Sequence, residues 1–240
     1  MIDWRITVTG QVPSTQDAVK VAGAGGEPEG FGVQALQQTG GRGRHGNGWV
    51  SPMGNLYLSV LLRPDCPAPD AGQIAFVAAL ALSKAMDEFI DTDAHVKTLK
   101  WPNDILIGGK KVSGILLESE IENGRCEWLV LGTGVNILAP PESGIGLDAV
   151  KARPVPIHPF RDRYLTHLSD YMDAWRTRGF APLRAEWMAQ AHGLNAPMSV
   201  RLPEVTYRGV FRGIDAQGGL MAEIDGETKR FTSGDVHFTH

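Results

Sequence analysis

Residues 56–90 have the sequence LYLSVLLRPDCPAPDAGQIAFVAALALSKAMDEFI, which contains the two kinds of element that decide the fold. Its first seven residues, 56–62, form an apolar run typical of a buried strand. After a proline-containing turn, apolar residues recur at helical spacing from Ala71 to Ile90, which predicts an amphipathic helix packed on a core. A buried strand next to such a helix indicates a sheet covered by helices.

Short apolar runs predict further strands, and Asn123-Gly124 is a strong hairpin turn between two of them. These predicted strands cover residues 32–37, 96–101, 105–107, 112–118 and 127–131. Their mixed order, with helices on one face, favours either an α+β fold or a mixed α/β sheet.

Three more helices are predicted from helical spacing and end signals. Large side chains repeat at this spacing over 160–175, and another helix is expected around 183–191. A shorter helix is expected near residue 15, with Ser14 or Thr15 as its side-chain cap.

From about residue 194 the pattern changes to short strands with frequent turns, which indicates a small β-barrel. The predicted strands cover 198–202, 206–214, 220–224 and 228–231. We therefore expect two domains, 1–192 and 193–240.

Composition excludes several classes of protein. The chain has 240 residues, 42% of them hydrophobic, which is enough for a full core. A net charge of −4 gives no basic face for nucleic acid or an anionic membrane. Residues 1–4 do not begin a signal peptide, and no stretch approaches the roughly 18 apolar residues of a membrane span. We expect a cytoplasmic protein.

Cysteines and histidines do not form a recognisable metal set. Cys66 and Cys126 are expected to be reduced thiols, because two cysteines make no disulfide framework. His237 and His240 lie in a terminal strand and tail without companion ligands, so we expect no structural zinc.

Residues 40–49, GGRGRHGNGW, have the composition of an anion-binding loop. Five glycines let backbone N–H groups approach a ligand, and arginine offers a planar fork of donors for phosphate or carboxylate. A merely flexible loop is the alternative. Residues 41–46 match the dinucleotide-binding pattern G-x-G-x-x-G, but 48–52, GWVSP, cannot open the helix that this pattern requires.

A second polar motif is KWPND at 100–104, followed by Lys111 and Gly114. It places charge among otherwise apolar strands. An ordinary turn is the alternative interpretation, because Pro, Asn and Asp often form turns.

Together, these motifs resemble biotin–protein ligases in order and spacing along nearly the whole chain. The matching segments are Ser14-Thr15-Gln16, Gln38, residues 41–44, Trp49, residues 100–104, Lys111, the segment GTGVN at 132–136, and RGIDAQG at 212–218. The resemblance implies an α+β fold: a catalytic domain with a mixed sheet like that of class II synthetases and biotin/lipoate ligases, followed by an SH3-like barrel.

The resemblance also implies a two-step reaction. Biotin reacts with ATP to form biotinyl-5'-AMP, and a lysine of the biotin carboxyl carrier protein of acetyl-CoA carboxylase, or of another biotin-dependent carboxylase, then takes the acyl group. No enzyme nucleophile is required, so catalysis becomes positioning and charge stabilisation. Arg42, Arg44 and Lys111, with Mg²⁺ on the nucleotide, would supply the positive charge.

Site residues follow from the same resemblance. Biotin would be bound by Ser14, Thr15, Gln16, Gln38, Arg42, Gly43, Arg44 and Lys111. ATP and the adenylate would be bound by Arg42, Arg44, Trp49, Asn103, Lys111 and Asn136. The catalytic residues would be Lys111, Arg44 and Asp104. The family pattern gives no certain protein ligand for the metal, although Mg²⁺ would lie near Asp104.

Some of these residues have simpler explanations. Trp49 could belong to the core, Lys111 could be a surface lysine, and Asn136 could merely end a strand. Asp104 must hydrogen-bond a donor, lie near metal or accept a proton, and orienting the incoming amine is one such role.

The chain departs from the family pattern at two loop positions. His45 and Asn47 stand where relatives carry arginines, so we expect either weaker phosphate attraction or compensation by another residue. No helix-turn-helix fits before Ser14, so we expect the monofunctional type rather than the DNA-binding repressor type.

Two other functions remain open. A lipoate or octanoate ligase or transferase shares the catalytic fold, and a non-catalytic biotin-binding regulator could use the same site. Oligomeric state is not given by the sequence, and a homodimer is among the options.

Overall fold

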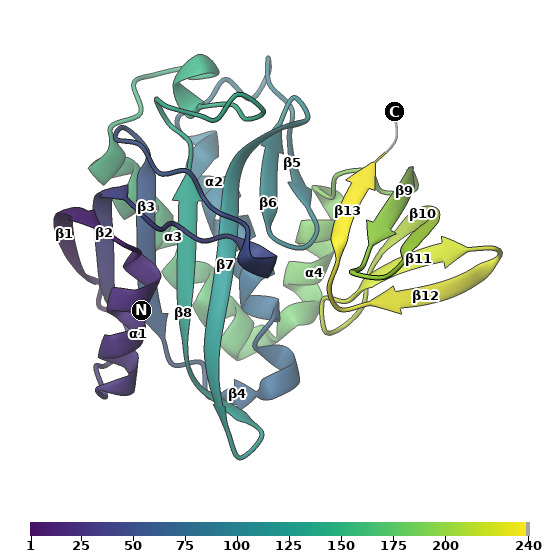
Figure 1. Ribbon diagram of the computed structural model, residues 1–240, viewed down its shortest axis with the longest axis horizontal. Helices are drawn as coiled ribbons and strands as arrows, with labels where there is room; N and C mark the ends of the chain where they lie inside the picture. The colour runs from purple at the N-terminus through teal and green to yellow at the C-terminus, as the bar shows by residue number, and fades with distance from the viewer. Residues whose placement is uncertain (239–240) are drawn as a thin grey trace.

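The computed structural model describes residues 1–238, apart from the side chain of His45. His240 lies outside the described residues. Two sheets carry the fold (Figure 1). The strands and helices of the first part are β1 (Arg5–Val12), α1 (Thr15–Ala24), β2 (Phe31–Gln38), β3 (Leu56–Leu62), β4 (Cys66–Pro67), α2 (Gln73–Asp87), β5 (Lys97–Lys100), β6 (Asp104–Ile107), β7 (Lys110–Glu122), β8 (Arg125–Val135), α3 (Ile157–Arg178) and α4 (Phe180–Ala189). The second part contains β9 (Pro197–Arg201), β10 (Thr206–Ile214), β11 (Leu220–Ile224), β12 (Glu227–Phe231) and β13 (Asp235–Phe238).

The first sheet has eight strands in the order β1-β2-β3-β8-β7-β6-β5, with β4 paired to β8. Strands β1 and β2 are parallel and the other pairs are antiparallel. The long hairpin β7–β8 turns at Asn123 and Gly124, both with positive φ, as the sequence predicted. The predicted mixed sheet with helices is confirmed.

Helices cover both faces of this sheet. Leu58 and Val60 of β3 pack in the main core with α2 and α3, whereas Leu61 packs with Val19 of α1 and Val130 of β8. Successive strand residues point to opposite faces, so α1 lies on the face away from the other helices. The expectation of helices on one face is therefore wrong for α1.

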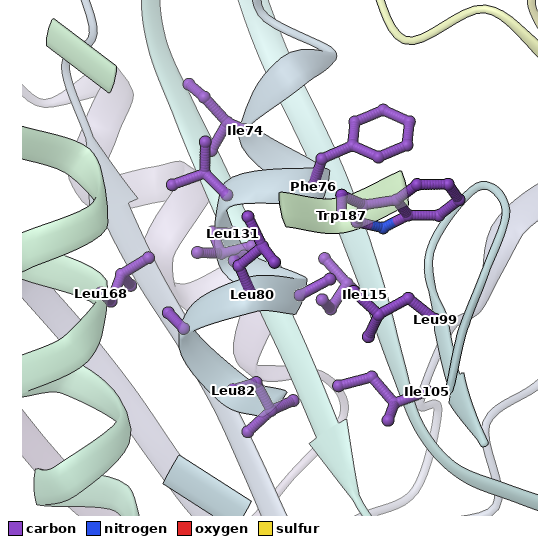
Figure 2. Close-up of a cluster of buried hydrophobic side chains, with 14 of the residues drawn as sticks. Ile74, Phe76, Leu80, Leu82, Leu99, Ile105, Ile115, Leu131, Leu168 and Trp187 are labelled. Carbon is purple, nitrogen blue, oxygen red and sulfur yellow. The ribbon is translucent and has the colours of Figure 1, made fainter. Parts of the chain in front are cut away.

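Figure 2 shows the main core, where α2 contributes Ile74, Phe76, Leu80 and Leu82. The Phe76 ring meets Trp187 of α4 edge to face at 5.2 Å between centroids. This packing holds α2 firmly behind the strands that carry the polar motifs.

The second sheet, in the order β12-β11-β10-β9-β13, lies beside the β5–β6 end of the first (Figure 1). Trp101 Nε1 donates to the carbonyl of Gly218 at 2.9 Å, and Gln73 Nε2 donates to Ala216 at 3.2 Å. Gly218 has φ +82°, and a Cβ there would come within 2.4 Å of the Phe76 ring. The turn 215–218, between β10 and β11, therefore contacts α2 and the 101–103 turn.

Ser14 occupies the backbone N-cap position of α1, but its side chain makes no cap bond. The predicted side-chain cap by Ser14 or Thr15 is therefore wrong. Gln38 Oε1 instead accepts from the backbone N–H of Thr15 at 2.9 Å. This leaves the Ser14 hydroxyl available for another partner.

Three further findings concern the described residues. No helix among residues 1–238 is long and apolar enough to cross a membrane. The same residues contain no group of three or more His, Cys, Asp or Glu placed to hold a metal. Cys66 and Cys126 are buried, free and directly opposite each other on β4 and β8.

Candidate active site

A cavity of about 270 Å³ opens on the α1 face of the first sheet, between α1, the glycine-rich loop and β13. All the sequence-predicted site residues line it except Asn136. The predicted residues that line the cavity are Ser14, Thr15, Gln16, Gln38, Arg42, Gly43, Arg44, Trp49, Asn103, Asp104 and Lys111.

One end of the cavity is formed by the start of α1. The hydroxyl of Ser14 and the Oε1 atom of Gln16 are buried and make no hydrogen bond within the described protein. Thr15 is engaged, since its hydroxyl lies 2.7 Å from that of Ser59. A buried polar atom without a partner costs free energy, so two such atoms at one cavity wall indicate a polar ligand.

Gln38 supports this wall. Its Oε1 accepts from the backbone and hydroxyl of Thr15, and its Nε2 donates to Ser51 at 3.0 Å. Both ends of the amide are used within the protein, so Gln38 fixes α1 to the loop. Its predicted contact with biotin stays a prediction.

Two glycines admit Trp49 to the floor of the cavity. Gly114 of β7 and Gly134 of β8 are directly opposite in the register. A Cβ on Gly134 would lie 2.6 Å from the Trp49 ring, and one on Gly114 would lie 3.0 Å from it. The indole therefore packs directly on the backbone of these two glycines and forms part of the cavity floor instead of the core. Its Nε1 is buried and has no hydrogen-bond partner among the described residues.

Lys111 and Asp104 face each other across the β6–β7 hairpin. Lys111 Nζ lies 2.6 Å from Asp104 Oδ1 and 5.2 Å from the centre of the Trp49 ring. Asn103 fixes the preceding turn, because its backbone carbonyl accepts from Ile115 N–H at 2.9 Å and its amide donates to the Ile115 carbonyl. The predicted turn is confirmed for Pro102 and Asn103, whereas Asp104 is the first residue of β6, and all three line the cavity.

The two loop arginines have different surroundings. Arg42 donates to both carboxylate oxygens of Asp17, at 2.8 and 2.7 Å, and to Glu118 at 3.3 Å. The hydrogen bonds from Arg42 lower the pKa of Asp17. The positive charge of Arg42 is therefore already balanced by the carboxylates of Asp17 and Glu118 at the edge of the cavity.

Arg44 lies deeper, with its guanidinium carbon 6.0 Å from the centre of the Trp101 ring. Burial lowers the pKa of its guanidinium, while the charges of Asp235 and Asp104 act to raise it. Since arginine keeps its proton in proteins, this desolvated cation is available to a phosphate or carboxylate.

Asn136 lies behind the cavity. It is buried, and its Nδ2 donates to the backbone carbonyl of Lys111 at 3.3 Å. This contact supports the start of β7, and a direct nucleotide contact stays a prediction.

Two contributions to the cavity were missed by the sequence reasoning. Lys100, at the end of β5, lines it, and burial lowers the pKa of its ammonium while Asp104 acts to raise it. Residues 234–237, at the start of β13, form a further wall. Lys100 belongs to a motif already singled out, but nothing local in the sequence places β13 there.

The cavity therefore combines two kinds of recognition. Ser14 and Gln16 offer neutral polar atoms at one end, while Arg44, Lys100 and Lys111 gather positive charge near Asp104 at the other. A ligand with a neutral hydrogen-bonding group and an anionic group fits this arrangement.

Comparisons with known proteins identify the family of this chain. Residues 10–136 match the model of the biotin/lipoate A/B protein ligase family, and residues 194–238 match the biotin protein ligase C-terminal domain. The biotin–[acetyl-CoA-carboxylase] ligase of Paracoccus denitrificans is 36% identical over 198 residues, covering 79% of this chain and 82% of that protein. The enzyme of the same name from Mycobacterium tuberculosis is 33% identical, covering 97% and 89%. The biotin protein ligase of Aquifex aeolicus in complex with biotin and ATP matches with a TM-score of 0.82 and 25% identity, covering 98% and 99%.

Proposed function

Because this chain belongs to the biotin/lipoate A/B protein ligase family, we propose that it is a biotin–protein ligase. It activates biotin with ATP to biotinyl-5'-AMP and transfers biotin to a lysine of a carrier protein. The observation that carries this proposal is one cavity with unpartnered polar atoms of Ser14 and Gln16 at one end and three cationic side chains at the other. Biotin has a neutral ureido ring and a carboxylate, which match these two ends.

Activation brings two anions together. A carboxylate oxygen of biotin bonds to the α-phosphorus of ATP, and the bond from that phosphorus to pyrophosphate breaks. Arg44, Lys100 and Lys111 offset the charge repulsion at this point.

In the second step the neutral amine of the carrier lysine bonds to the acyl carbon, the bond from that carbon to the phosphate oxygen breaks and AMP leaves, and the proton lost by the nitrogen passes to solvent water. Asp104 already forms an ion pair with Lys111, so it orients cations and amines beside the acyl group. The alternative role for Asp104 is that of a general base for this amine.

Mg²⁺ fits this site as an ion carried by the nucleotide. Magnesium commonly binds through one or two carboxylates together with substrate phosphates, and Asp104 and Asp235 both line the cavity beside the cations. The ion would stabilise negative charge on the phosphates.

The names of the relatives point to acetyl-CoA carboxylase as the acceptor. We therefore propose a biotin carboxyl carrier domain, from acetyl-CoA carboxylase or another biotin-dependent carboxylase, as the partner. The domain division at 192/193 agrees with the start of the second family match at residue 194. A cytoplasmic location, the option of a homodimer, and independence from nucleic acid and membranes stay predictions.

A pyrophosphate exchange assay tests this function. We expect exchange of labelled pyrophosphate into ATP with biotin, and acylation of a purified carrier domain at its lysine. Lipoate and octanoate serve as competing acids. Exchange with lipoate or octanoate but not with biotin would overturn the proposal, and no exchange with any acid would support the non-catalytic regulator.

A further inference from the structure

Gln16 has a fixed orientation in the cavity wall. Its Nε2 donates to Glu118 Oε2 at 3.0 Å, and its Oε1 is buried without a partner among the described residues. A Cβ on Gly132, in the floor of the cavity, would lie 2.7 Å from this Oε1. The acceptor end of the amide therefore lies against the floor, and the donor end faces Glu118.

Glu118 is anchored on β7 by two cations. Lys20 Nζ lies 3.0 Å from Oε1, and Arg42 Nη2 lies 3.3 Å from Oε2. Glu118 does not line the cavity. It therefore acts on a ligand only through the residues that it holds.

We propose that Glu118 is a positioning residue that sets which end of the Gln16 amide faces the substrate. An ionised carboxylate accepts hydrogen bonds and donates none, so Gln16 must turn its NH₂ to Glu118 and its oxygen to the cavity. A ureido ring carries N–H donors, which need an acceptor of this kind. This inference rests on the proposed function, because it takes biotin as the substrate.

The same carboxylate also pairs with Arg42, which belongs to the glycine-rich loop. If Arg42 moves to a ligand, Lys20 still holds Glu118 through the other oxygen. The orientation of Gln16 is therefore kept when the loop moves.

The test is Glu118→Gln. A glutamine at 118 can accept from Gln16 or donate to it, so the two amides can pair in either orientation. We expect the KM for biotin in pyrophosphate exchange, and the Kd for biotin by calorimetry, to rise about tenfold, while kcat changes less than about twofold. Glu120→Gln is the matched control, because Glu120 is exposed two residues along the same strand, and it should match the wild type.

The double variant Gln16→Glu with Glu118→Gln separates orientation from packing. Here residue 118 must donate and residue 16 must accept, so an acceptor oxygen again faces the cavity. We expect the KM for biotin to fall back towards the wild-type value. If Glu118 had a purely structural role, the KM for biotin would instead be higher in the double variant than in Gln16→Glu or Glu118→Gln alone.

Outcomes for the inference and for the function can be distinguished. If the wild type and Glu120→Gln exchange with biotin and Glu118→Gln has the same KM, the inference is wrong and the function stands. If the wild type shows no biotin-dependent exchange, the function itself is wrong. Should Glu118→Gln fail to fold, Glu118→Ala removes the acceptor that orients the Gln16 amide, and a wild-type KM in that variant would equally overturn the inference.

Discussion

The ammonium of Lys111 lies 2.6 Å from the carboxylate of Asp104, across the β6–β7 hairpin. Asp104 is directly opposite Gly114 in this hairpin, and the absence of a side chain at Gly114 leaves room for the Lys111 chain, because a Cβ there would come within 3.2 Å of Lys111 Cε. The ion pair with Asp104 therefore fixes the position of the Lys111 ammonium beside the reacting groups.

Lys111→Ala should lower biotin-dependent pyrophosphate exchange by at least about 100-fold, because one cation at the reacting centre is lost. Folding should be unaffected, since the side chain of Lys111 is 38% exposed. Lys110→Ala is the control, because Lys110 is exposed beside it on the same strand. Near-normal exchange in Lys111→Ala would remove this residue from the site.

Arg44→Gly should speed the release of biotinyl-5'-AMP, because the loop loses the cation that faces the intermediate and excludes water less well. We expect the release rate, followed by filter binding of labelled adenylate, to rise about tenfold. A tenfold change corresponds to about 1.4 kcal/mol of binding free energy, the size expected for the loss of one charged hydrogen bond. Arg44→Lys keeps the charge and should release more slowly than Arg44→Gly. Unchanged release from Arg44→Gly would reject this role.

Gly134→Ala should displace Trp49 from the cavity floor, because the new Cβ would lie 2.6 Å from the indole. Overpacking of this kind costs about 1–3 kcal/mol, so we expect kcat/KM for ATP to fall roughly tenfold or more. The emission spectrum of Trp49, isolated by difference against Trp49→Phe, should change as well. Gly10→Ala is the control, since a Cβ there would meet nothing within 4 Å; equal effects in both variants would argue against the glycine floor.

Glu88 gives a prediction for acid stability. Hydrogen bonds from Arg163, and then from His167, lower the pKa of Glu88 from 4.5 to about 2, against the opposing effect of burial. The stabilisation is therefore present above the unfolded pKa and is lost as the pH falls from about 4.5 towards 2. The free energy of unfolding in urea, measured across this range, should fall more steeply for the wild type than for Glu88→Gln.

For this experiment Glu120→Gln is the control, because Glu120 is exposed and makes none of these contacts. It should keep the steep wild-type dependence. Parallel curves for the wild type and Glu88→Gln would show that the Glu88 cluster does not contribute to stability.

Local sequence signals predicted much of the fold. The apolar run at 56–62 is β3, and the helical spacing over 71–90 contains α2. Such elements are predictable because their periodicity follows from which face they bury. Strand β1 was not predicted, since its pairing with β2 depends on a partner about 25 residues away.

The sequence motifs named most of the residues that line the cavity, and the structure shows how these residues come together. Residues 14–16, 42–44 and 111 converge on one cavity, as their resemblance implied. The sequence could not show that the Gln38 side chain, and not Ser14, accepts from the N–H at the start of α1. Nor could it show that Gly114 and Gly134 are opposite each other beneath the Trp49 ring. These relationships depend on strand register and on contacts between distant segments, which composition and spacing do not encode.

Residues 234–237, which form one wall of the cavity, are synthesised after all the other residues that line it. Strand β13 pairs with β9 and follows every other described element in the sequence. A ribosome would therefore release the adenylation machinery, residues 14–111, long before the segment that encloses it. Truncations that remove β13 would leave the cavity open on this side, so a reactive acyl phosphate formed there would be exposed to water.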